Sequence, residues 1–352
     1  MSNQPKLKLN SFIAYRVQAG LVETLHDQID ALAITSTEQA IAELEPAEPQ
    51  GSQWSAIGVA PVHENRFALH VGDGVALNVR FSERVLPASV IKKALNERID
   101  HYTELEGRRP GKKFIMDLKD QVVGELLPQA FVKVSYVTCL FRRSREHGDL
   151  LFIFTSSHKK ADSVLSVLSV AMNAAVGTAL NASPVTTQRH IPLALTALAK
   201  DALHVFEDNS PNYEHVLEAS SNALLHGAEK RRIRIKDRDV AGDEIQALLN
   251  DGYTVHDLAM TLGHAGDVLA DFTVNEHLVF KRFVLDRIKG ERSSEQDLVA
   301  TMLLISRTAQ KALEAVVELA GGVSPASNND VEKPSAAGKT QSAAPFDDDE
   351  EF

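Results

Sequence analysis

Residues 85–95 read Val85-Leu86-Pro87-Ala88-Ser89-Val90-Ile91-Lys92-Lys93-Ala94-Leu95, the start of an amphipathic helix opened by a proline. We predict a helix from about Ala88 to Glu106 and a second from about Met116 to Leu127, which ends at Pro128. The loop between them carries Arg108, Arg109, Lys112 and Lys113. The sequence therefore predicts a helical hairpin domain over residues 84–130 with a basic tip, although a solvated charged loop would have the same composition.

Strand patterns lie on both sides of this hairpin. Two short apolar runs, 67–71 and 75–79, are separated by Gly72-Asp73-Gly74, which is a strong β-hairpin signal. Further strands are predicted at 9–17, 131–141 and 150–155. Helices are predicted at about 19–43 and 159–175. We predict that residues 1–83 and 131–187 form one central α+β domain with an antiparallel sheet.

A third region, residues 188–322, is predicted to be an α+β base domain. Around Ile233 and Ile235 apolar and basic residues alternate, which is typical of a half-buried strand with a basic open face. Helices are predicted at 242–250 and at about 295–319, the latter ending at Gly321-Gly322. Residues 323–352 are predicted to be a flexible linker and an acidic tip.

Basic residues cluster although the chain is acidic, with a net charge of −11. Phosphate binding requires several cations on one surface, so a lined channel is a simpler account of the clusters than scattered solvation. Aromatic residues make up only 6%, which favours contact with the DNA backbone over base stacking. The candidate DNA-binding residues are Lys92, Lys93, Arg108, Arg109, Lys112, Lys113, Arg142, Arg143, Arg232, Arg234, Lys236 and Arg238.

The chain ends in Phe346-Asp347-Asp348-Asp349-Glu350-Glu351-Phe352. Like charges repel along this run, so we expect a disordered tail. It is similar to the C-terminal tip of bacterial single-stranded DNA-binding proteins, although Glu351 stands where that tip has a proline. The resemblance implies a docking peptide for recombination or replication enzymes, anchored by Phe352. The alternative is that the acidic residues only confer solubility.

Enzyme signatures are lacking in the sequence. It has no Gly-x-x-x-x-Gly-Lys-Ser/Thr loop, no Gly-x-Gly-x-x-Gly after a strand, and no histidine pair at metal-ligand spacing. Cys139, the only cysteine, lies in a predicted strand and is expected to be a buried, inert thiol. No apolar run reaches membrane-spanning length. We therefore expect a cytoplasmic, nucleoid-associated protein that is not an enzyme and needs no metal or cofactor.

Two motifs carry a resemblance to a known family: residues 85–95, quoted above, and Leu118-Lys119-Asp120 through Leu126-Leu127-Pro128-Gln129-Ala130-Phe131. Through them the chain resembles the bacterial recombination-associated protein family RdgC. That resemblance implies a ring-shaped homodimer whose positively charged hole admits DNA without sequence preference, and a restraint on RecA-type recombinases. It places Phe131 at a dimer contact between the hairpin tips, and Lys236 and Arg238 on a DNA-facing strand.

These observations lead to one principal hypothesis and several alternatives. The principal one is a non-catalytic, sequence-independent DNA-binding protein that coats single strands and recruits partner enzymes through its tail. One alternative is a double-strand-binding ring that restrains RecA, with a tail that regulates the basic channel. The others are a protein-interaction scaffold that binds no DNA, and a nuclease.

Overall fold

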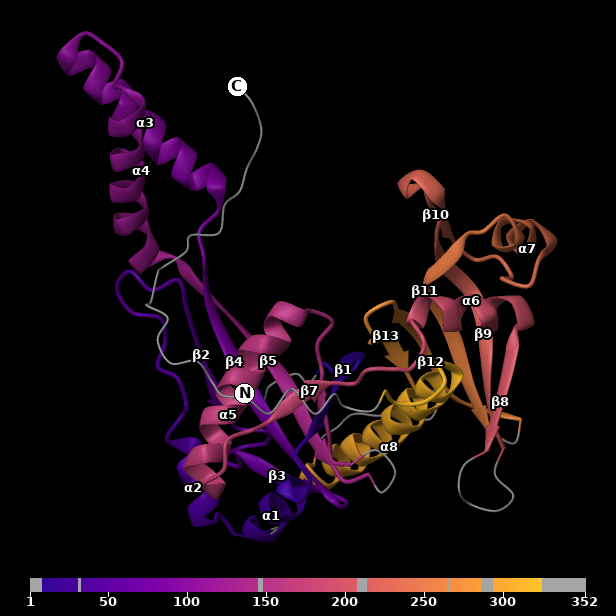
Figure 1. Ribbon diagram of the computed structural model, residues 1–352. Coiled ribbons are helices and arrows are strands. Elements are labelled where there is room, and N and C mark those ends of the chain that lie inside the picture. Colours follow the sequence, from indigo (N-terminus) through magenta and orange to yellow (C-terminus); the bar gives the residue numbers. More distant parts are fainter. Residues whose placement is uncertain are drawn as a thin grey trace.

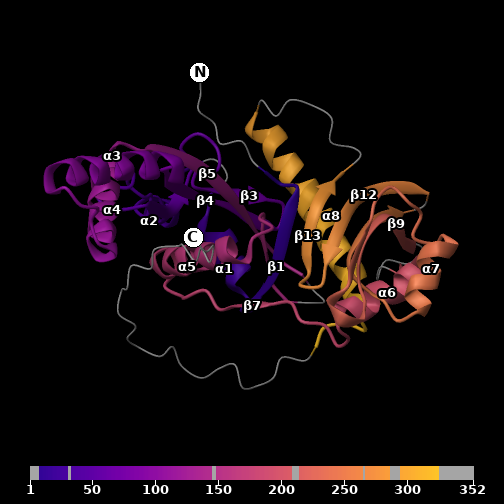
Figure 2. The same cartoon turned by 90° about the horizontal axis from the view of Figure 1, so that it is seen from above.

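The computed structural model describes residues 8–30, 33–144, 148–207, 214–264, 266–285 and 294–324. Two arms rise from a common base on the same side of the molecule (Figure 1). One arm is a helical hairpin, and the other is the end of a sheet that carries β10 and α7. Seen from above, the two arms lie at opposite ends of the molecule (Figure 2).

One antiparallel sheet joins the two halves. Its strands are ordered β10-β9-β11-β12-β13-β1-β6-β5-β4-β2, so the N-terminal strand lies beside the last strand of the chain. This confirms the predicted α+β class with antiparallel pairing. The bounds of the first half are β1 Ser11–Val17, β2 Ser55–Ala60, β3 Ala68–Val71, β4 Gly74–Val85, β5 Phe131–Arg142, β6 Leu150–Ile153 and β7 Ala182–Pro184. Those of the second half are β8 Leu203–Glu207, β9 Glu214–His226, β10 Arg232–Ile235, β11 Thr254–His264, β12 Asp267–Asn275 and β13 Val279–Val284.

Strand β1 supplies residues to two hydrophobic cores. Phe12 and Ala14 point into one core, and Ile13, Tyr15 and Val17 into the other. This follows from the period of two in a strand, which sends alternate side chains to opposite faces of the sheet. The Phe12 ring stacks on Phe280 of β13, with centroids 4.4 Å apart. It meets Phe152 of β6 edge-on at 5.5 Å, so one side chain links both neighbouring strands.

Helices cover the two faces of this sheet. The core that contains Ile13 also buries residues of α1 (Leu21–Gln28), α2 (Ser36–Ala42) and α5 (His158–Val176). The core that contains Phe12 buries residues of α6 (Ile191–Asp201), α7 (Asp243–Asn250) and α8 (Glu295–Leu319). Helix α8 packs on β3 in one half and on β8 in the other. The bounds predicted for the final helix are confirmed.

The helical hairpin is confirmed as a protruding arm formed by α3 (Ala88–Glu106) and α4 (Lys112–Leu126). Gly107 ends α3 in the left-handed conformation, at φ 65°. An ion pair between Arg98 and Glu125 ties the helices together. The second helix begins four residues earlier than predicted, because Gly111 after Pro110 serves as its extended N-cap. Lys112 and Lys113 therefore lie in the first turn of α4 and not in the loop.

The single helix predicted over 19–43 is wrong, because the chain forms α1 and α2 there with a break between them. Ile29 turns to an extended conformation and ends α1. Thr35 then caps a new helix by accepting the N–H of Glu38 over 3.2 Å. Residues 271–280 belong to two strands, β12 and β13. The long strand β9 was not predicted.

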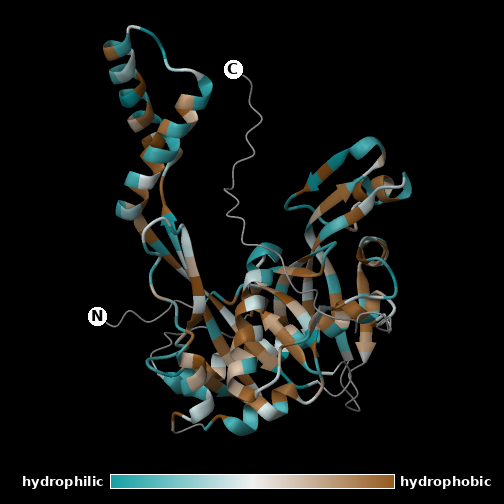
Figure 3. Cartoon of the chain, turned by 60° about the vertical axis from the view of Figure 1, so that its left-hand side comes forward, coloured by the Kyte–Doolittle hydropathy of each residue, from teal (hydrophilic) through white to brown (hydrophobic). Residues whose placement is uncertain are grey.

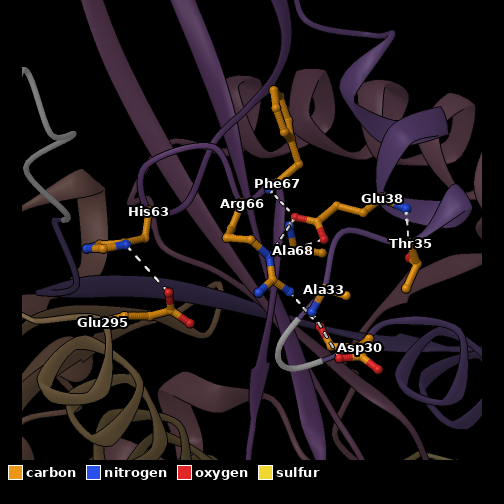
Figure 4. Close-up of polar contacts among 9 residues, drawn as sticks. All are labelled: Asp30, Ala33, Thr35, Glu38, His63, Arg66, Phe67, Ala68 and Glu295. Atoms are coloured by element: carbon orange, nitrogen blue, oxygen red, sulfur yellow. Dashed lines mark hydrogen bonds and ion pairs between the residues drawn. The ribbon is translucent and has the colours of Figure 1, made fainter.

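The break between α1 and α2 brings Glu38 into a buried ion pair (Figure 4). Glu38 has no exposed surface, and its carboxylate accepts the Arg66 Nε–H over 3.1 Å. It also accepts the backbone N–H of Phe67 over 2.7 Å, while an Arg66 Nη–H donates to the carbonyl of Asp30 over 2.6 Å. The pair thus fastens α2 to the segment that leads into β3.

Hydrophobic residues concentrate in the sheet and beneath its helices, whereas many residues at the ends of the arms are hydrophilic (Figure 3). Among the described residues, no helix combines the length and the apolar character needed to cross a membrane.

Replacing Glu38 with Gln should lower the free energy of unfolding by about 3–5 kcal/mol, because it removes the carboxylate from a buried ion pair. The double variant Glu38→Leu/Arg66→Met should lose less free energy of unfolding than the summed losses of Glu38→Leu and Arg66→Met measured separately. Urea unfolding measures both. Glu45→Gln, which removes the more exposed pair between Glu45 and Arg80 at 3.5 Å, is the control and should cost at most about 1 kcal/mol.

Replacing Phe12 with Ala should lower the free energy of unfolding by about 3–5 kcal/mol, because it opens a cavity in the core that joins the two halves of the sheet. Chemical unfolding monitored by circular dichroism provides the value. Phe114→Ala is the matched control, since Phe114 is 42% exposed on the hairpin and its loss should cost less. Equal losses for the two variants would contradict the central role of β1.

Candidate nucleic-acid interface

The end of the hairpin arm carries the first group of predicted cations. Arg108 and Arg109 are exposed in the turn after α3, and Lys112 and Lys113 are exposed in the first turn of α4. Lys92 and Lys93 are exposed nearer the start of α3. Two apolar side chains, Leu105 and Met116, are 72% and 66% exposed near the same turn. The hairpin end is thus both basic and apolar.

The second arm carries the other predicted group on β10. Arg232 and Arg234 are exposed, whereas Ile233 is half-buried and Ile235 is buried, so the predicted alternation is confirmed. Lys236 follows the strand and is exposed. Arg238 forms an ion pair with Glu244 of α7, and both side chains remain largely exposed. The cations of β10 therefore share one open face.

A polar groove of about 430 Å³ extends this basic face across the sheet. Arg234 and Lys236 line it from one side, and Lys281 and Arg282 of β13 line it from the other. Asp257 of β11 also lines the groove, where its carboxylate lies 3.6 Å from the Lys281 Nζ. Burial raises the pKa of Asp257, against the opposing effect of Lys281 and the nearby arginines. The groove is therefore lined by four cations and two carboxylates, those of Asp257 and Asp237.

Lys281 and Arg282 were not among the predicted residues, and a bulge explains how both reach the groove. Arg282 has φ 52°, and the pairing of β12 with β13 is irregular at this point. An extra residue in a strand shifts the side-chain alternation by one. Phe280 and Phe283 are consequently both buried, while Lys281 and Arg282 both point outward. Two adjacent cations between two phenylalanines, Phe280-Lys281-Arg282-Phe283, are the signal that could have found them.

The third predicted group pairs with carboxylates of the protein itself, Arg142 at a largely buried position and Arg143 in a partly exposed ion pair. The Arg142 guanidinium lies 3.4 Å from the Asp73 carboxylate and donates to Ser306 and Gln310 of α8. Burial lowers the pKa of Arg142, and its side chain is only 12% exposed. Arg143 pairs with Glu23 over 2.7 Å. We therefore leave both residues out of the proposed interface.

Phe131 lies at the root of the hairpin and not at its tip. It is the first residue of β5, opposite Val85 of β4, and it is 89% exposed. Within one copy, Phe131 thus lies away from the hairpin turn, because the helices end at Leu126 and the chain re-enters the sheet at Phe131. The dimer contact at this residue stays a prediction.

The remaining predictions concern the cysteine, a metal site and the acidic tail. Cys139 is fully buried, as predicted, and burial raises the pKa of its thiol. Within the described ranges, no group of three or more His, Cys, Asp or Glu side chains could hold a metal ion. The tail residues, Phe346 to Phe352, lie outside the described part of the chain.

Comparison with known proteins defines the class of this fold. Residues 15–323 match the family described as "Putative exonuclease, RdgC". The recombination-associated protein RdgC of Pseudomonas entomophila is 29% identical over 79% of this chain and 88% of its own length. The protein of that name from Pseudomonas aeruginosa strain LESB58 is 29% identical over 84% of this chain and 93% of its own length.

The protein of that name from Haemophilus influenzae strain PittGG is 29% identical over 72% of this chain and 80% of its own length. The family match covers most of the chain and includes both arms. The chain therefore belongs to the RdgC family.

Proposed function

We propose that this chain is a non-catalytic, sequence-independent DNA-binding protein of recombination and replication that acts as a ring-shaped homodimer. The proposal rests on the placement of exposed cations on both arms of one continuous sheet, at the hairpin end and in the groove between β10 and β13. The recombination-associated relatives support the biological setting. A cytoplasmic, nucleoid-associated location follows from the same proposal.

Backbone contact is the mode of binding that this arrangement favours. The groove offers Arg234, Lys236, Lys281 and Arg282, whose charges can contact phosphates. Contacts of this kind hold the DNA backbone and do not distinguish one base sequence from another. Cations on two separated arms can contact phosphates on both sides of a nucleic acid that lies between them. We therefore propose affinity that depends steeply on salt and little on sequence.

The proposal has two forms, which differ in the role of the C-terminal tail. In the first form, the protein coats single strands, and the acidic run ending in Phe352 recruits recombination or replication enzymes. In the second, the protein encloses double-stranded DNA and restrains a RecA-type recombinase, while the tail competes with DNA for the basic groove. The proposed dimer contact includes Phe131, whose 89% exposure leaves it open to a second copy.

Charge reversal tests the two arms separately. One variant reverses Arg108, Arg109, Lys112 and Lys113, and another reverses Arg232, Arg234 and Lys236. Each should weaken binding to short single- and double-stranded DNA at low salt by at least about tenfold and flatten the salt dependence, because fewer counterions are released. Salt-titrated fluorescence anisotropy measures both quantities.

Arg143→Gln is the control for these variants, since Arg143 already pairs with Glu23. Unchanged affinity in both reversed variants would contradict DNA binding by the arms and favour a scaffold that binds no DNA. The same DNA incubated with magnesium tests the nuclease alternative that the family description raises. The proposal requires the strands to remain intact.

Replacing Asp257 with Asn should strengthen DNA binding several-fold and steepen its salt dependence. The change removes the carboxylate beside Lys281 and so adds one net positive charge to the groove. Asp251→Asn, at the end of α7, changes the net charge equally at an exposed position outside the groove and is the matched control. Equal effects of the two substitutions would show that the groove is not the contact surface.

Deleting residues 346–352 separates the two forms of the proposal. Recruitment predicts unchanged DNA affinity and loss of binding to partner enzymes, whereas self-inhibition predicts tighter DNA binding. The measurements are DNA anisotropy and pull-down with recombination and replication proteins. Deletion of residues 328–334 from the linker is the length control. If the tip deletion matches this control in both assays, the tail has neither role.

A further inference from the structure

A second pocket, of about 600 Å³, lies between the halves of the molecule and takes no part in the groove described above. Its lining comes from the first residue of α5, from the segment 184–191 and from the turn between β12 and β13.

Hydrogen-bond donors dominate the polar lining of this pocket. Its four basic side chains come from three separate elements, and Thr186 and Thr187 also line it, with the Thr187 hydroxyl donating to the Arg189 carbonyl over 2.7 Å. The His158 and His277 rings meet edge-on, with centroids 5.8 Å apart. The four basic residues are His158, Arg189, His190 and His277.

Two helices also begin at this pocket. His158 is the first residue of α5, which has 19 residues, and His190 is the N-cap of α6, which has 11. Side-chain capping is supplied by Ser157 in α5, whereas His190 supplies none in α6. In the first turn of α6, however, Pro192 has no N–H, and the N–H groups of Leu193 and Ala194 donate to the carbonyl of His190 over 3.0 and 3.3 Å. The donors of this pocket therefore come mainly from its side chains.

Backbone pairing holds the segment that carries Arg189 in place. The N–H groups of Gln188 and Arg189 donate to the carbonyls of Gly322 and Ala320 over 3.0 and 2.9 Å. The N–H of Ser324 donates to Thr186 over 2.9 Å. The chain after α8 is thus paired with this segment, so the basic side chains project from a fixed backbone.

The one carboxylate in the lining, Glu276, is engaged with histidines. It accepts a hydrogen bond from His256 Nδ1 over 2.5 Å and lies 3.8 Å from His277 Nε2. Burial would raise the pKa of Glu276, but the hydrogen bond from His256 and the charges of the surrounding histidines outweigh it and lower that pKa. Its negative charge is therefore balanced at the rim of the pocket by these rings.

We propose that this pocket binds a phosphoryl group, held by Arg189 together with His158, His190 and His277. The group could come from a DNA backbone that lies between the arms, a source that rests on the proposed function, or from a free phosphorylated molecule. Either source presents the same tetrahedral anion. Arg189 supplies a permanent charge with a planar donor fork that suits phosphate.

The first test titrates inorganic phosphate into the full-length protein at constant ionic strength and measures binding by calorimetry. The wild-type chain should bind phosphate, and Arg189→Gln should weaken that binding at least about tenfold, as expected for loss of a hydrogen bond between charged groups. Lys200→Gln, at the far end of α6, is the matched control and should bind like the wild type. Absence of phosphate binding in the wild type, or equal binding by both variants, would overturn the proposal.

The second test identifies the source of the phosphate. If it is DNA, Arg189→Gln should also weaken binding to a 20-bp duplex several-fold and lower the salt slope by about one phosphate. If it is a free molecule, DNA affinity should match that of Lys200→Gln while phosphate binding is still lost. Phosphate binding that persists in a protein with no DNA affinity would refute the proposed function and leave the pocket assignment intact.

Discussion

The pairing of β1 on both of its edges is the constraint on which the arrangement of the molecule depends. Ile13 lies in register with Ile153 of β6 and also with Val279 of β13. Residues more than 250 positions apart in the chain are thereby fixed in one sheet, with Phe12 stacked across the junction. Helix α8 reinforces the junction, since Arg142 of the first half and His215 of the second half both contact it. The distance between the two basic arms is therefore set by packing and not by a flexible linker.

Local signals were enough to predict much of this fold. The turn Gly72-Asp73-Gly74, Pro87 before α3 and Gly321-Gly322 after α8 each mark a boundary through backbone chemistry that involves no distant residue. The break at Ile29 could not be predicted in this way. Helical periodicity continues through the break in the sequence, and the local cap of Thr35 on Glu38 is joined by a distant contact of Glu38 with Arg66, 28 positions away.

In the candidate site too, features set by neighbouring residues could be predicted from the sequence, and features set by distant contacts could not. The open face of β10 followed from alternation within five residues. The groove did not, because Arg234, Asp257 and Lys281 become neighbours only through strand pairing from β9 to β13. The bulge at Arg282 also reverses the alternation that a regular strand would have. Conversely, Arg142 was a candidate phosphate ligand from the sequence. In the structure its guanidinium pairs with Asp73 and donates to Ser306 of α8.

The hairpin arm gains little stability from its own core. Across α3 and α4 only Ile91, Ile99 and Val122 are buried. Near its turn Leu105 and Met116 remain exposed, and Phe131 is exposed at its root. A monomer gains nothing from apolar surface in such an arm, whereas a second copy could cover it. The proposed homodimer accounts for both features of the arm, because apolar residues can form the contact between copies while the neighbouring cations stay free to contact DNA enclosed by the ring.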